Sequence, residues 1–173
     1  FEGCDSLMDI EIISQNSITL KSKCFIRNKN LQFVKFKSNQ ITIEDECFLH
    51  RHKLSTVKFD CQIVEIGKGS FKNCIFISSV NFNNAETVSI GSNSFSGYSK
   101  LNNINISASS EIKLSEFCFC GAMNLESITL KSNKVTLGRH CFKACPILKN
   151  IQFSNVQEAT LDCCVFEKCD SLN

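Results

Sequence analysis

The sequence of 173 residues lacks tryptophan and holds one proline, one tyrosine, seven glycines and a formal net charge of only +2. So little proline and glycine excludes a collagen-like or linker-like chain, and the low net charge with 43% hydrophobic residues excludes a disordered one. No run approaches the roughly 18 apolar residues of a membrane span. The basic excess typical of nucleic-acid-binding domains is also missing. We therefore expect a packed structure with no nucleic-acid partner and no membrane span in these residues.

Phenylalanine, by contrast, is abundant, and eight of the fifteen recur every 23 or 24 residues. These repeat-starting residues are Phe1, Phe25, Phe48, Phe71, Phe95, Phe119, Phe142 and Phe166. Counted from each of them, apolar residues return at positions three, six, nine and eleven, and a second apolar pair follows a polar turn. The chain is therefore seven copies of one unit and part of an eighth.

The spacing within a unit indicates its backbone. A period of three over the first six positions is typical of a 3₁₀-like or single-turn coil, and the period of two that follows is typical of a strand. A unit this short cannot bury enough surface by itself, so the copies must stack at about 4.8 Å, the strand spacing. The sequence predicts one mostly β solenoid over residues 1–173, with parallel strands on both faces and little α-helix, cut from a longer array.

Six of the seven glycines fall in two columns of the repeat. Gly3, Gly97 and Gly121 lie two residues after the phenylalanine, whereas Gly67, Gly91 and Gly138 directly follow the second strand. Both columns are predicted to be tight turns that require a positive φ.

The unit, written most fully in residues 64–80, resembles the BspA-like leucine-rich repeats: Phe-x-x-Cys-x-x-Leu-x-x-Ile-x-Phe, a turn, then Val-x-Ile-Gly-x-x-Ser-Phe. The chain departs from that pattern in lacking a proline after the first strand and in placing Cys or Ser before the phenylalanine. The resemblance covers essentially the whole chain and implies a leucine-rich-repeat solenoid. It also implies a surface-exposed or secreted adhesion or interaction protein of anaerobic bacteria or protist parasites, with a cytoplasmic location as the alternative.

Eight of the twelve cysteines occupy the two inward columns, at position three and directly before the phenylalanine. We interpret them as small buried hydrophobes, and Tyr98 and Ala122 fill position three in other copies. The other four cysteines are predicted to be the reactive ones: Cys61, Cys120, Cys163 and Cys164. No pair has the C-x₂-C spacing of a structural zinc site, so no metal site is predicted.

The three histidines do not suggest catalysis. His50 and His52 lie in a polar turn, where we interpret them as solvated, and His140 reads as an isolated side chain. No phosphate-binding glycine loop, no GxSxG and no Cys/His pair at catalytic spacing is present. We therefore predict a protein that is not an enzyme and needs no cofactor.

Position ten, between two inward strand residues, must point outward and is polar in every copy. With the neighbouring Lys37, this column supplies the candidate partner-binding residues: Glu11, Lys35, Lys37, Lys58, Asn81, Asn105, Thr129 and Gln152. Lys35 and Lys58 are expected side by side on adjacent strands, an arrangement that invites an anion. The preferred function is a non-enzymatic interaction or adhesion module that binds a protein or glycan on this first-strand face.

Two alternatives stay open. Neither end of the chain shows a polar cap, which favours an architectural spacer or end-to-end self-association. A basic patch in repeats 2 and 3, formed by Lys35, Lys37 and Lys58, favours an anionic glycan or a membrane surface as the ligand.

Overall fold

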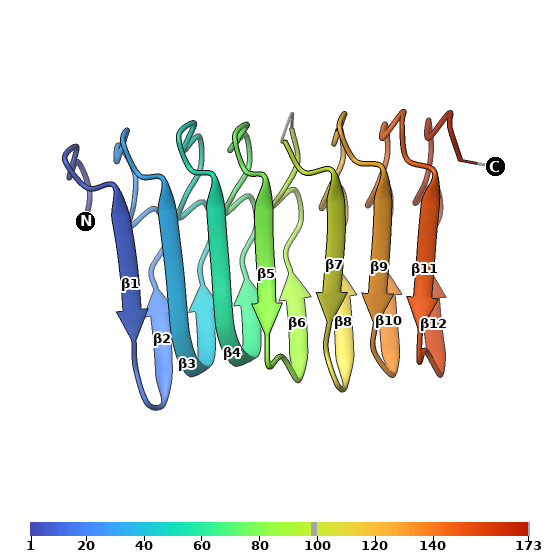
Figure 1. The fold of residues 1–173 in the computed structure, drawn as a ribbon, viewed down its shortest axis with the longest axis horizontal. Coiled ribbons are helices and arrows are strands. Elements are labelled where there is room, and N and C mark those ends of the chain that lie inside the picture. The colour runs from blue at the N-terminus through green and yellow to red at the C-terminus, as the bar shows by residue number, and fades with distance from the viewer. Residues whose placement is uncertain (98–99, 173) are drawn as a thin grey trace.

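The chain winds into a row of parallel strands, with single-turn coils along one edge and tight turns along the other (Figure 1). The computed structural model describes residues 1–97 and 100–172, so Tyr98 lies outside the described residues. Within those ranges it has twelve strands and no helix. They are β1 (Asp9–Ile13), β2 (Ser17–Leu20), β3 (Phe33–Ile43), β4 (Thr56–Ile66), β5 (Ser79–Asn83), β6 (Thr87–Ile90), β7 (Asn103–Ser107), β8 (Glu111–Leu114), β9 (Ser127–Lys131), β10 (Lys134–Leu137), β11 (Asn150–Ser154) and β12 (Glu158–Leu161). The predicted β solenoid is confirmed.

Strands β3 and β4 correct one detail of the prediction, because each combines the two expected short strands in one strand of 11 residues. Repeats 2 and 3 are neighbours, and both have the turn that is one residue shorter. The ladder between them therefore stays in register through the turn, where Lys37 pairs with Asp60 and Ser38 with Cys61. In the other copies the first and second strands remain separate, because the copy itself or the copies beside it have the longer turn.

The repeat-starting phenylalanines form a continuous ladder through the core. Neighbouring ring centroids are 4.7–5.7 Å apart and their planes lie within 12° of each other. Phe25, Phe48, Phe71 and Phe142 are almost completely buried. This spacing matches the separation of hydrogen-bonded strands, so the rings stack at the pitch that the backbone sets. The predicted ladder is confirmed.

Two columns of the coil adopt left-handed backbone. The column two residues after the phenylalanine has positive φ in every copy: Gly3, Arg27, His50, Asn73, Gly97, Gly121, Ala144 and Lys168. The prediction for the three glycines of that column is therefore confirmed. A second left-handed column, two residues before the phenylalanine, was not predicted: Lys23, Glu46, Gly69, Asn93, Phe117, His140 and Cys164.

The prediction for Gly67, Gly91 and Gly138 was wrong, because none of them has a positive φ. Their role is close approach. A Cβ atom placed on any of them would lie within 2.9 Å of backbone atoms of the preceding turn. Glycine in this column therefore lets consecutive turns stack without a side chain between them.

Cysteine burial mostly follows the repeat, and Cys4, Cys24 and Cys61 depart from it. Most cysteines of the inward columns are buried, and Cys163 and Cys164 are exposed as expected. Cys4, in the first repeat, is exposed, and Cys24 is partly buried. The prediction that Cys61 is reactive was wrong: it is 1% exposed, since β4 continues through the turn and directs its sulfur inward, 3.4 Å from Ser38 Oγ. All twelve cysteines are free thiols.

We expect native thiol labelling with a maleimide to be fast at Cys163 and slow at Cys61, Cys118 and Cys141. The thiolate is the reactive form, and burial raises the pKa of Cys118 well above its usual value. Labelling followed by peptide mass spectrometry over time measures each site, and the urea-unfolded chain serves as the fully reactive control. Rapid native labelling of Cys118 or Cys141 would show that the inward assignment is wrong.

Candidate binding face

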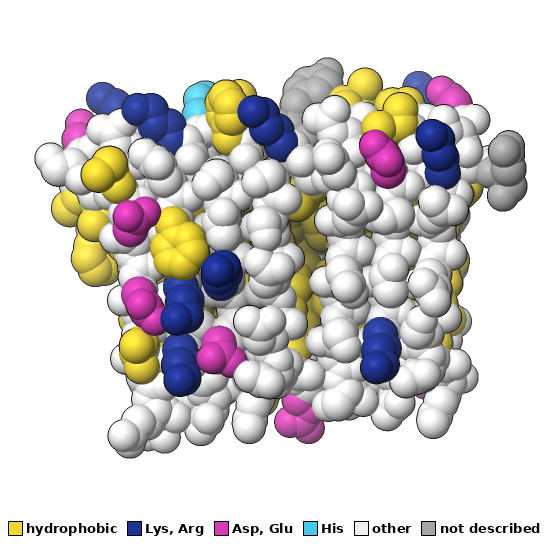
Figure 2. Space-filling view, viewed as in Figure 1, with side chains coloured by type: hydrophobic (Ala, Val, Ile, Leu, Met, Phe, Trp, Pro, Cys, Tyr) yellow, Lys and Arg dark blue, Asp and Glu magenta, His cyan; other side chains and the backbone are white. Residues whose placement is uncertain are grey.

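The predicted position-ten residues lie at the centres of the first strands, on the face seen in Figure 2. Backbone register aligns Glu11, Lys35, Lys58 and Asn81 across β1, β3, β4 and β5. A separate ladder aligns Asn105, Thr129 and Gln152 across β7, β9 and β11. The candidates therefore form two groups instead of one continuous column.

The division between the groups is a break in the sheet. Among the described residues, β5 and β7 share no hydrogen-bonded ladder, although β6 and β8 behind them remain paired. A narrow apolar cleft follows the break, lined by Val80, Phe82 and Ile104, and it is visible as a yellow band in Figure 2. It falls where the inner column changes from Phe82, which stacks on Phe59 at 5.1 Å, to the smaller Ile106.

The group over β1, β3 and β4 is charged. Lys35 and Lys58 lie side by side as predicted, but each has its own partner. Lys35 Nζ is 2.7 Å from Glu11 Oε1, and this carboxylate raises the pKa of Lys35. Lys58 Nζ lies over the ring of Phe33, 5.6 Å from its centroid, so the ammonium gains a cation–π contact. These contacts reduce the repulsion that the two lysines would otherwise feel.

A depression beside the starts of β3, β4 and β5 was not predicted from the sequence. It has a volume of about 400 Å³ and is lined by Gln32, Lys53, Ser55, Phe76, Ser78 and Lys100. Phe76 is 44% exposed, and Lys100 Nζ lies 4.5 Å from its ring centroid. The signal that points to it is the position of Phe76, which falls outside both phenylalanine columns of the repeat.

We call the residues Lys35, Lys37, Lys53, Lys58 and Lys100, with the rings of Phe33 and Phe76, the lysine-rich half of the first-strand face. Lys100 comes from the repeat beyond the break, but its ammonium lies over the Phe76 ring. Asp9, Glu11 and Asp60 are the nearby carboxylates; Asp9 pairs with Phe33 across β1 and β3, and Asp60 also accepts a hydrogen bond from Asn84. Cations therefore outnumber anions here. Beyond the break the position-ten residues Asn105, Thr129 and Gln152 are uncharged, and Lys131 is the equivalent of Lys37.

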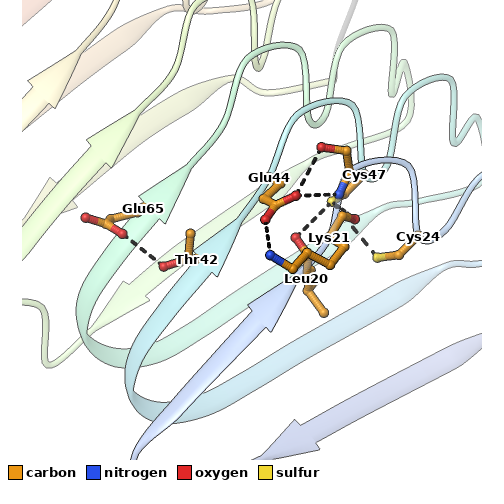
Figure 3. A network of polar contacts seen from close by, with 8 residues as sticks. Leu20, Lys21, Cys24, Thr42, Glu44, Cys47 and Glu65 are labelled. Carbon is orange, nitrogen blue, oxygen red and sulfur yellow. Dashed lines mark hydrogen bonds and ion pairs between the residues drawn. The ribbon is translucent and has the colours of Figure 1, made fainter.

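Charged groups on the second-strand side also form contacts between repeats. Glu44 accepts a hydrogen bond from Lys21 Nζ at 2.7 Å (Figure 3) and another from the backbone N–H of Ser22 at 3.0 Å. These donors lower the pKa of Glu44. Glu65 likewise accepts a hydrogen bond from Thr42 of the preceding turn. The first-strand face is the stronger candidate for binding a partner, because its lysines outnumber its carboxylates.

The comparisons with known proteins agree with the repeat architecture. The chain matches the model of the BspA type leucine-rich repeat region, in six copies, over residues 1–113 and 64–173. No curated protein and no solved structure matches the chain. In the part of the chain that the structure describes, no helix has the length and hydropathy needed to cross a membrane. Since the two matched stretches together cover every residue, the chain belongs to the BspA-type leucine-rich repeat family.

Proposed function

We propose that the chain is a non-enzymatic interaction module at the cell surface, and that the lysine-rich half of its first-strand face binds an acidic segment of a partner protein. Repeats of this family are commonly protein-interaction modules, which supports the class of function. The observation that carries the proposal is the grouping of five lysines with the exposed Phe76 ring and the half-buried Phe33 ring over neighbouring repeats.

The geometry favours an acidic peptide over a neutral sugar. A sugar that stacks on Phe33 or Phe76 would have to displace the lysine ammonium that already lies over each ring. A carboxylate pairs with that ammonium while the ring keeps its contact. Adjacent strands place Lys35 and Lys58 one strand spacing apart, about 4.8 Å, so successive acidic residues of an extended peptide can reach both.

We expect a fluorescein-labelled oligoglutamate peptide to bind the chain, and the triple change Lys35→Gln, Lys58→Gln and Lys100→Gln to weaken binding about tenfold. The estimate assumes about 0.5 kcal/mol for each exposed ion pair. Fluorescence anisotropy measures the affinity, which should also fall as ionic strength rises because exposed charge pairs are screened.

The matched control removes lysines from outside this half, with Lys131→Gln and Lys149→Gln, and should leave the affinity unchanged. Equal weakening by both sets of substitutions would contradict the proposed location. Binding that ignores salt would contradict the charge-based recognition. Capture of a sulfated glycan without any affinity for the peptide would replace the proposed partner with an anionic glycan.

A further inference from the structure

Three different metal-ligating side chains meet on the coil edge of the last repeats. His140 and Cys164 occupy equivalent left-handed positions in consecutive repeats, with φ of 56° and 58°. Glu167 follows Phe166 directly, so the same turn that carries Cys164 also carries this carboxylate. One nitrogen of His140, the sulfur of Cys164 and one oxygen of Glu167 all lie within 4.8 Å of one another.

His140 is held rigidly and has an unsatisfied nitrogen. Its side chain is buried, with 8% of the residue exposed, and the Phe117 ring stacks on the imidazole at 4.9 Å. Nε2 accepts a hydrogen bond from Arg139 Nε at 3.1 Å. Nδ1 lies 3.0 Å from Glu167 Oε2, but no hydrogen bond of good geometry reaches Nδ1 from the described residues. A cation placed beside both atoms would satisfy this buried nitrogen.

The carboxylate and the thiol are suited to the same cation. Glu167 Oε2, the oxygen that faces His140 Nδ1, also lies 3.0 Å from Lys143 Nζ, so this carboxylate is already placed to bind cations. Zinc bonds of about 2.0–2.3 Å place tetrahedral ligand atoms about 3.3–3.8 Å apart. The nitrogen and oxygen, 3.0 Å apart, are slightly closer than this and need to separate by only about 0.3 Å. Cys164 is exposed, and a side-chain rotation that moves its sulfur by about 1 Å completes the set.

We propose that His140, Cys164 and Glu167 bind Zn²⁺, with water as the fourth ligand. Nitrogen and sulfur donors favour zinc over calcium and magnesium, which take oxygen ligands. On binding, Cys164 releases its proton to solvent, and the imidazole moves its proton from Nδ1 to Nε2 and stays neutral. Arg139 then turns away from Nε2, which its exposed position allows. One proton leaves for each zinc ion bound.

Calorimetric titration of the metal-free chain with Zn²⁺ tests the site, with one ion per chain expected. Cys164→Ser and His140→Gln should each weaken binding at least tenfold, because each removes a ligand. Cys163→Ser is the matched control, since it removes the adjacent exposed thiol and should leave the affinity unchanged. Arg139→Gln should strengthen binding, because this arginine competes for the histidine nitrogen.

Cobalt(II) gives a second readout. The Co²⁺-loaded chain should show a sulfur-to-metal charge-transfer band in the near ultraviolet that Cys164→Ser removes and Cys163→Ser retains. Circular dichroism confirms that each variant is folded. Absence of zinc binding in the unmodified chain would overturn the proposal. Full affinity in the folded Cys164→Ser and His140→Gln variants would also overturn it, because the ion would then be held by other thiols.

Discussion

Replacing Phe95 with alanine is expected to lower the free energy of unfolding by about 3–5 kcal/mol, as measured by urea denaturation. Phe95 is 3% exposed, and its ring lies between those of Phe71 and Phe119, at 5.0 and 5.3 Å. The substitution removes both stacking contacts and opens a cavity. Neighbouring rings cannot move in to fill it, because hydrogen-bonded turns hold them at the strand spacing.

Phe95 also begins the repeat that follows the break between β5 and β7, which adds a second expectation. With the front ladder absent there, the phenylalanine ladder and the β6–β8 pairing carry much of the coupling between the two parts of the solenoid. Phe95→Ala should therefore make the unfolding transition broader or split it in two, because repeat proteins are coupled only through nearest neighbours.

The matched control for Phe95 is Asn105→Ala in the same repeat. Asn105 is exposed at the centre of β7, so its loss should change the free energy of unfolding by less than about 0.5 kcal/mol. Similar losses at both positions would contradict the inward ladder.

The repeat made most of this fold predictable. A residue that returns every 23 or 24 positions must stack on its own copy, so both the phenylalanine ladder and the pairing of Lys35 with Lys58 follow from spacing alone. The break between β5 and β7 was not predictable in this way. It falls between Phe82 and the smaller Ile106, and both residues fit the same apolar pattern, which also holds where Ile12 and Phe36 stay paired.

The candidate sites were harder to predict, because they depend on side-chain directions in neighbouring turns. His140 has no partner nearby in the sequence, because Glu167 is 27 residues away. The stacking of consecutive repeats nevertheless brings His140 Nδ1 within 3.0 Å of Glu167 Oε2. One usable signal was present. The three phenylalanines outside both columns, Phe33, Phe76 and Phe117, lie against Lys58, Lys100 and His140 respectively. A phenylalanine outside the two core columns therefore lies beside each candidate binding site.

Gly91→Ala should be at least as damaging as the loss of a core ring, with an expected cost of about 4–5 kcal/mol. A Cβ atom at this position would lie 2.7 Å from the carbonyl carbon of Gly67 and 2.8 Å from the oxygen of Ile66. Both belong to the backbone of the preceding turn, and Gly91 N–H donates a hydrogen bond to that same oxygen at 2.6 Å. Relief of the clash must therefore separate two turns and break the contact that joins them.

A glycine in the left-handed column separates this effect from backbone strain. Gly121 has φ of +74° and no atom within 4 Å of an added Cβ, so Gly121→Ala should cost only the left-handed strain, about 1–2 kcal/mol. Ala144→Gly, at the equivalent position of the next repeat with φ of 58°, should stabilise the chain by a smaller amount. Urea denaturation of the three variants provides the comparison. If Gly91→Ala cost no more than Gly121→Ala, the turns would not be in backbone contact at Gly91, and close approach would not explain this glycine column.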